Sequence, residues 1–147
     1  MPGTLGQTFR SAITDTGARL GTITEDCAQR PYADGKWLRK EVLGHLLDSA
    51  ANNQLRFTCA ALNGSYSGSE YDGEGWVRLN GYAQLPYATL LRQWRLRNEQ
   101  LANLVERIPD TALAAICRIG NNEPVTLQFL IEDYLAHLEH HVKQITA

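Results

Sequence analysis

Three of the four histidines in this chain lie close together in the sequence HLEHH, at residues 137–141. The fourth, His45, lies far upstream within EVLGHLLDSAANN. A neutral imidazole offers a nitrogen lone pair to a divalent metal ion. Residues four apart lie on the same face of a helix, so His137 and His141 could bind one ion together. The spacing therefore suggests a metal site.

The clustered histidines do not point the same way on the helix predicted for this segment. At about 100° per residue, His141 falls inside the apolar stripe and His137 falls on its edge. His140 falls outside the stripe, and we expect it to be exposed. His45 lies on a polar flank of its own helix. This geometry permits a three-histidine metal site, but it equally permits one buried, hydrogen-bonded histidine and three exposed ones.

Apolar residues recur at spacings of three and four through most of the chain, which predicts amphipathic helices. The predicted helices span residues 5–23, 37–62, 86–108 and 124–145, the last beginning at Pro124 or Thr126. Pro86 suits the first turn of the third helix. With no strands of consequence, the pattern predicts an all-α four-helix bundle and a single domain over residues 1–147.

Two connecting segments differ from the helices in composition. NGSYSGSEYDGEG, at residues 63–75, is rich in Gly and Ser and is long enough to be functional. We predict that it is flexible and that WVRLNGY after it forms one or two helical turns. AAICRIGNNEPVTL alternates briefly and contains a turn signal at residues 120–122, which favours a short hairpin or an extended loop.

Composition and charge exclude several classes of protein. The 147 residues carry a net charge of −2, with neither sign concentrated in runs, which argues against nucleic-acid binding. No apolar run is long enough to cross a membrane, and MPGTLGQTFRSAITDTG has no signal-peptide core, so we expect a cytoplasmic protein. Cys27, Cys59 and Cys117 form no CxxC pair, and we expect buried free thiols.

Four motifs occur in a fixed order along the chain. They are GKWLRKEVLGHLLDSAANNQLRF, YDGEGWVRLNGY, CRIGNNEPVTL and IEDYLAHLEHHVKQI. Together, from about Gly35 to Ile145, they resemble the DinB/YfiT-like superfamily of metal-binding four-helix bundles. The resemblance implies that His45, His137 and His141 are the metal ligands. It also implies up-down-down-up topology, a long crossover between the second and third helices, and a homodimer.

Three imidazoles on one divalent ion leave at least one coordination position open, as in catalytic sites. Zinc is the default ion, and nickel or iron would also fit. Such an ion lowers the pKa of bound water to about 7, or stabilises the thiolate of a low-molecular-weight thiol cosubstrate. Family members include thiol-dependent S-transferases and isomerases, and others are called metal-dependent hydrolases. The resemblance therefore implies an S-transferase or a hydrolase acting on a small electrophile.

A non-catalytic metal-binding bundle with a stress-response or sensor role is the alternative. A fourth protein ligand would close the coordination sphere in that case, and His140 or Glu41 turning inward is the most plausible candidate. An open position beside a polar pocket would instead favour an enzyme.

Several polar residues are candidates for supporting the metal ligands. Glu41 and Asp133 each stand one turn before a histidine, where a carboxylate could accept the free imidazole N–H, although both could simply be solvated. Further candidates for the wall of a substrate pocket, the first two for an anionic substrate, are Asn52, Arg56, Arg97 and Asn98. We expect Asp48 at the surface. The expected packing anchors are Trp37, Trp76 and Trp94.

Overall fold

The computed structural model describes residues 3–147 and is mostly helical. Four long helices dominate it: α1 (Gly3–Leu20), α3 (Arg39–Asn63), α5 (Tyr87–Arg107) and α6 (Leu127–Ile145). The shorter helical elements are α2 (Glu25–Ala28), α4 (Gly73–Asn80), η1 (Tyr82–Gln84) and η2 (Asp110–Ala114). The strands are β1 (Ser65–Gly68), β2 (Ile116–Ile119) and β3 (Val125–Thr126). The predicted set of four long helices is confirmed.

Local sequence signals fix where the site-bearing helices begin and end. Thr126 caps α6 because its hydroxyl accepts the Phe129 backbone N–H at 3.1 Å. α3 ends at Gly64, whose φ of 78° is left-handed, a conformation that glycine adopts without steric cost. Asp72 caps α4 through the Gly75 N–H. These caps set the start of α6 and the end of α3, the two helices that carry all four histidines.

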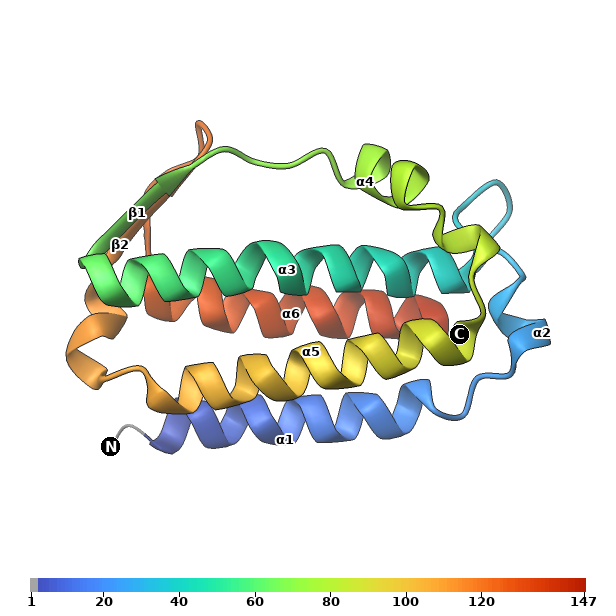
Figure 1. Cartoon of the computed structure of the whole chain (residues 1–147), viewed down its shortest axis with the longest axis horizontal. Helices are drawn as coiled ribbons and strands as arrows, with labels where there is room; N and C mark the ends of the chain where they lie inside the picture. Colours follow the sequence, from blue (N-terminus) through green and yellow to red (C-terminus); the bar gives the residue numbers. More distant parts are fainter. Residues whose placement is uncertain (1–2) are drawn as a thin grey trace.

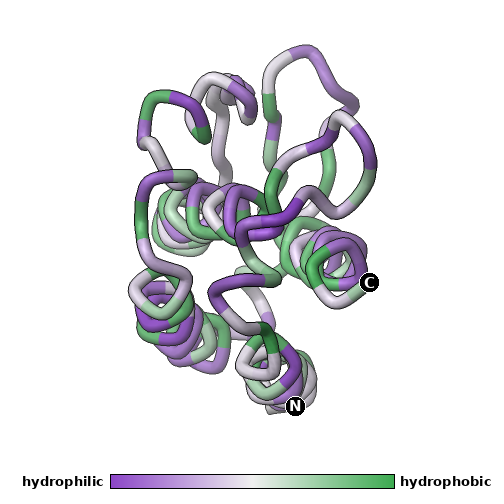
Figure 2. The backbone as a smooth tube through the Cα atoms, turned by 90° about the vertical axis from the view of Figure 1, so that its right-hand side faces the viewer, coloured by the Kyte–Doolittle hydropathy of each residue, from purple (hydrophilic) through white to green (hydrophobic). Residues whose placement is uncertain are grey.

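The four long helices form two layers, and the connecting segments lie over one of them. α3 packs against both α5 and α6, while α1 packs against α5. Figures 1 and 2 show the segment between α3 and α5, including α4, running over the layer formed by α3 and α6. The C-terminal ends of α3 and α5 meet the N-terminal end of α6 at one end of the bundle (Figure 1). The covered layer is the one that contains the histidines.

A small sheet closes that end of the bundle, where no strands of consequence were predicted. β1 pairs in parallel with β2, and β2 pairs antiparallel with β3. The predicted hairpin option at residues 114–127 is confirmed by the β2–β3 pair. The Gly- and Ser-rich stretch, predicted to be flexible, supplies β1 and the start of α4 instead. Parallel pairing with a distant segment leaves no local sequence signal, which is why the prediction missed it.

The hydrophobic core runs along the whole bundle, and its largest fully buried side chains include Trp94, Phe9 and Phe57. Trp94 is thus the packing anchor that was predicted. Lys40 is 3% exposed, and its ammonium donates to the Leu85 carbonyl at 2.7 Å and pairs with Glu25 at 2.8 Å. Within residues 3–147 no helix is long and apolar enough to cross a membrane.

Candidate metal centre

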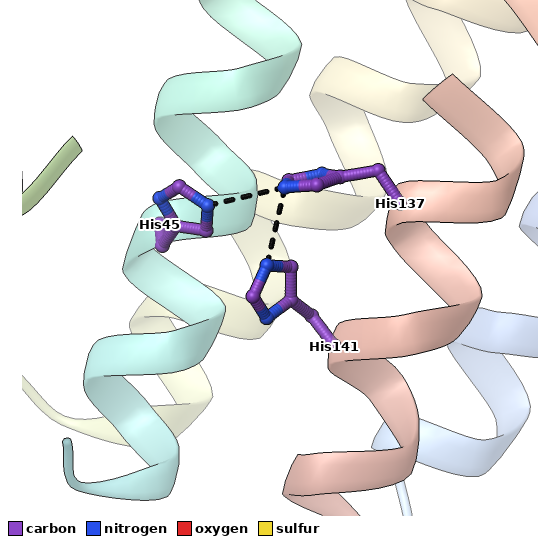
Figure 3. A group of neighbouring side chains, drawn as sticks. All are labelled: His45, His137 and His141. Carbon is purple, nitrogen blue, oxygen red and sulfur yellow. Dashed lines mark hydrogen bonds between the residues drawn. The ribbon is translucent and has the colours of Figure 1, made fainter. Parts of the chain in front are cut away.

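The side chains of His45, His137 and His141 converge between α3 and α6 (Figure 3). The Nε2 atom of His137 lies 3.3 Å from His45 Nε2 and 3.1 Å from His141 Nε2. One ligand atom from each ring lies within 4.8 Å of the others. Helix α6 supplies two rings from successive turns, and α3 supplies the third across the helix–helix interface. The structure thus brings together the three predicted residues.

The donor set fits a divalent metal ion. A tetrahedral ion with metal–nitrogen bonds of about 2.0–2.1 Å holds its ligand nitrogens about 3.3 Å apart, which matches the two short separations. A proton on His137 Nε2 can form a hydrogen bond with the Nε2 atom of either His45 or His141, but not with both. Without a cation, lone pairs on these nitrogens would face one another. A cation between the rings satisfies all three nitrogens. In residues 3–147 no fourth His, Cys, Asp or Glu joins this group, which leaves room for a non-protein ligand.

Burial keeps these histidines in the state that a metal requires. Desolvation, with a smaller contribution from neighbouring rings, lowers the pKa of His45 and of His137 to about 4. Burial also lowers the pKa of His141, an effect that its hydrogen bond with Gln144 partly offsets. At neutral pH the imidazoles are therefore uncharged, and their lone pairs are available for coordination.

Gln144 is a supporting residue that the sequence did not reveal. His141 Nδ1 lies 2.8 Å from Gln144 Oε1, so Nδ1 carries the proton and Nε2 keeps its lone pair toward the centre. The sequence signal is weak, because an amide three residues after a histidine is common on helix surfaces. His45 Nδ1, by contrast, is buried and has no hydrogen-bond partner within residues 3–147.

His140 lies outside the centre. It is exposed, and its Nε2 lies 3.5 Å from Gln144 Nε2. Its ring lies 4.9 Å from the His141 ring, centroid to centroid, but it is not part of the group of converging nitrogens. The angular prediction that separated His140 from its two neighbours matches this arrangement. His140 therefore does not close the coordination sphere.

The segment between α3 and α5 covers the centre. A Cβ added to Gly73 would lie 3.3 Å from His45 Cε1, so the backbone at the start of α4 rests directly against this ring. The Trp37 ring lies 5.3 Å from the His45 ring, centroid to centroid, so it forms one wall of the centre as well as packing on the core. The Trp76 ring lies 5.4 Å from the Tyr71 ring, centroid to centroid. Trp76 is 37% exposed and is therefore not a buried anchor.

The two predicted carboxylate partners do not bond to the histidines. Glu41 Oε1 accepts the Leu38 backbone N–H at 3.0 Å, which caps the start of α3. Asp133 is exposed and lines a groove further along α6. Their sequence spacing was right for an imidazole contact, but each side chain takes another direction.

That groove lies on the sheet side of the metal centre, where Asp133 stands one turn before His137, and it has a volume of about 370 Å³. Arg56 lines it, with its guanidinium 5.7 Å from the centroid of the Tyr71 ring. Its apolar wall includes Phe129 and Leu130 of α6. Since residues eleven apart lie on one face of a helix, Arg56 and His45 point to the same side of α3, about 16 Å apart along its axis. Asn52, between them, donates its amide to the Asp48 carbonyl at 2.9 Å.

Three predictions about polar residues on α3 and α5 are wrong. Asn98 is fully buried, where it donates to the Trp94 carbonyl and accepts the Tyr134 hydroxyl, so it completes the core rather than a pocket wall. Arg97 is exposed on α5 and is absent from the groove. Asp48, expected at the surface, is 3% exposed and accepts the Tyr82 hydroxyl at 2.5 Å, because η1 folds over it.

The three cysteines are free, as predicted, but only Cys117 is buried. Cys27 and Cys59 are half-buried. None of the three lies in the candidate centre, since the cluster of possible ligands found within residues 3–147 contains histidines alone.

The fold and the histidine cluster together define a helical bundle with a candidate metal centre. Curated relatives of similar sequence carry names that agree with this class. "Putative metal-dependent hydrolase YfiT" of Bacillus subtilis is 26% identical over 125 residues, covering 84% of this chain and 70% of that protein. A protein of Geobacillus thermodenitrificans with the same general name is 24% identical over 129 residues, covering 87% and 72%.

The chain belongs to the DinB superfamily, whose family model matches residues 8–145. The solved structure of Bacillus subtilis YfiT superposes with a TM-score of 0.86 at 22% identity, covering 96% of this chain and 83% of that one. A mycothiol-dependent maleylpyruvate isomerase superposes with a TM-score of 0.81 at 10% identity. The match covers this whole chain but 61% of the isomerase. At these identities the two structures establish the shared fold.

Proposed function

We propose that this protein is a metal-dependent enzyme that acts on a small electrophilic substrate, either as a thiol-dependent S-transferase or as a hydrolase. The observation that carries the proposal is the convergence of three neutral imidazole nitrogens at 3.1 and 3.3 Å, with no fourth protein ligand among residues 3–147. His45, His137 and His141 would hold the ion. Zinc is the first choice, with nickel and iron as the other candidates.

When bound, a divalent ion in such a site supplies Lewis acidity and activates a bound water or thiol. The chain's own residues prepare the site for this chemistry. Gln144 fixes the tautomer of His141, and Trp37 walls off the ring of His45. The backbone at Gly73 covers the same ring, which limits the access of bulk water. The groove beside Arg56 leaves space for the body of a substrate.

Two nucleophiles remain open within this proposal. The relatives named as metal-dependent hydrolases favour water, while the mycothiol-dependent isomerase shares the fold and favours a low-molecular-weight thiol cosubstrate. Arg56 donates a weak hydrogen bond to the Ser69 carbonyl at 3.5 Å and could orient an anionic group of either substrate or thiol.

The test is a two-part activity screen of zinc-, nickel- and iron-loaded protein. One part pairs small thiols with electrophiles, and the other presents esters and amides for hydrolysis. We expect turnover in one part that disappears in the His137→Ala variant and persists in His140→Ala. A metal-loaded protein that is inert in both parts would favour the non-catalytic stress-response or sensor bundle.

The proposal also includes the arrangement and setting of the chain. The predicted up-down-down-up topology, with its crossover between α3 and α5, agrees with the meeting of the α3 and α5 C-terminal ends at the sheet (Figure 1). We further propose a cytoplasmic homodimer with a small-molecule substrate and no nucleic-acid partner. Sedimentation of the purified chain would test the dimer directly.

A further inference from the structure

Tyr71 stands between the histidine cluster and the groove. It belongs to the covering segment, two residues before Gly73, whose backbone rests against the His45 ring. It also lines the groove, where the guanidinium of Arg56 faces its ring. Two residues of extended chain span at most about 7 Å, so the Tyr71 backbone lies close to the candidate metal centre.

A chain of buried polar side chains on α3 leads to the Tyr71 hydroxyl. Asn53, 9% exposed, donates its amide to Ser49 Oγ at 3.3 Å and to the Ser49 carbonyl at 2.8 Å. Ser49, 3% exposed, lies next to the Tyr71 hydroxyl. Since Ser49 Oγ accepts from Asn53, its own proton can be donated to the Tyr71 oxygen. Tyr71 then keeps its hydroxyl proton for a different acceptor.

The position of Ser49 determines which acceptors the Tyr71 hydroxyl proton can reach. Ser49 lies one turn after His45, on the same side of α3, about 6 Å further along the axis. The Tyr71 hydroxyl therefore lies about one helical turn from the metal ligand His45, while the residue also lines the groove. Burial raises the pKa of Tyr71, which keeps the phenol protonated as a donor at neutral pH.

We infer that Tyr71 is a substrate-binding residue whose hydroxyl donates a hydrogen bond to an oxygen atom of the molecule held at the three-histidine centre, with Ser49 and Asn53 as positioning residues. The inference rests on the proposed function and narrows its substrate class. The electrophile carries a carbonyl, carboxylate or similar oxygen beside its reacting atom, and is not a simple alkyl halide. A donor held in place by Ser49 pays little entropic cost when the substrate oxygen arrives.

The test uses the full chain loaded with cobalt(II), whose visible spectrum reports ligand binding. Acetate is one probe, because one carboxylate oxygen on the metal leaves the other free to accept a hydrogen bond. Ethanethiol is the second probe, because beyond its sulfur it offers only hydrocarbon. We expect Tyr71→Phe to weaken acetate binding about tenfold, Ser49→Ala to weaken it about two- to threefold, and neither to change ethanethiol binding.

Tyr66→Phe is the matched control, since Tyr66 is a half-buried tyrosine of β1 in the same covering segment. It should leave both affinities unchanged. Equal acetate affinities for wild type and Tyr71→Phe, with a normal cobalt spectrum, would overturn the inference and leave the proposed function standing. So would an equal loss for both probes, which would make Tyr71 a support of the metal site. A wild-type chain that takes up no cobalt would overturn the proposed function and this inference together.

Discussion

Two grooves of nearly equal size lie on different layers of this bundle, and only one of them looks like a functional site. The groove between α1 and α5 has a volume of about 380 Å³, and the one along α3 and α6, which reaches Asp133 one turn before His137, about 370 Å³. In the α1–α5 groove, Arg95 donates to the Gly17 carbonyl of α1, and Arg10 pairs with Glu106 at 2.6 Å nearby. These charged groups are satisfied across the helix interface, and the buried polar atom left without a partner among the described residues of this groove is the single indole nitrogen of Trp94.

The α3–α6 layer differs because its polar groups are left facing a shared point. Three imidazole nitrogens converge there, and His45 Nδ1 is buried without a partner in the part of the chain that the structure describes. A separate segment of chain covers this layer, whereas in residues 3–147 the α1–α5 layer has no such cover (Figure 2). Volume alone therefore does not distinguish a functional site from a surface groove. The distinguishing feature is a set of unsatisfied donors and acceptors that point at one place.

The largest effect that would sharpen this contrast is on metal retention. His137 lies within 3.3 Å of both other ligand nitrogens, so His137→Ala should weaken zinc binding more than about 100-fold, beyond the range expected for indirect support. Competition with a chelating dye measures the affinity. His140→Ala is the control and should retain wild-type affinity. Equal losses in the two variants would contradict the assignment of ligands.

A cavity in the opposite layer should affect stability but not metal binding. Leu101 is fully buried in α5, so Leu101→Ala should lower the free energy of unfolding by about 2–5 kcal/mol, measured by urea denaturation. Zinc affinity of the folded variant should remain unchanged. Leu96→Ala, at a position 59% exposed on the same helix, should change stability by less than about 0.5 kcal/mol. A large loss of zinc affinity in Leu101→Ala would show that the two layers are coupled.

The supporting residues offer a finer comparison within the α3–α6 layer. Gln144→Ala removes the acceptor that fixes the His141 tautomer, and we expect about tenfold weaker zinc binding. Asp133→Asn should leave the zinc dissociation constant unchanged, because Asp133 lines the groove and does not bond to His137. The reverse ranking would restore the carboxylate partner that the sequence suggested.

The smallest effect concerns pH and involves Glu25 of α2, which bonds to one residue from each layer, Lys40 of α3 and Tyr87 of α5. Hydrogen bonds from Lys40 and from the Tyr87 backbone hold the pKa of Glu25 at about 2, below its usual 4.5. A depressed carboxylate pKa stabilises the fold above the unfolded-state value and loses that contribution as pH falls. Glu25→Gln should therefore melt at a lower temperature than wild type at pH 7, and the difference should shrink between pH 4.5 and about 2. A difference that stays constant over this range would exclude the ion pair as its cause.

The sequence predicted those features that depend on local periodicity. The apolar spacing located the four long helices, and the angular positions of His137, His140 and His141 on α6 correctly separated the inward rings from the exposed one. The family resemblance supplied His45 as their partner. Helix geometry is regular enough that a stripe of residues defines a direction in space.

What the sequence could not show depends on segments that are distant along the chain. An interrupted stripe at Asn98 looks the same whether the residue lines a pocket or is satisfied by Tyr134 in the core. Asp48 appeared to be a surface residue because the tyrosine that buries it comes from η1. β1 depends on pairing with β2, about fifty residues later. Tyr71 and Gln144 drew no attention because neither type nor spacing marks them as parts of a site.

The division of the three histidines between α3 and α6 has a consequence for how the protein could acquire its ion. His45 and His137 are 92 positions apart, so a chain whose last helix has not docked presents only the pair on α6. Tight capture would have to wait until the bundle is assembled, and the captured ion would then fasten its second and final long helices to each other. At a free ion concentration 1,000 times the dissociation constant, binding would add about 4 kcal/mol to the free energy of unfolding. Loss of bound metal would therefore be an early sign of α6 detaching, whether through heating or through proteolysis near the C-terminus.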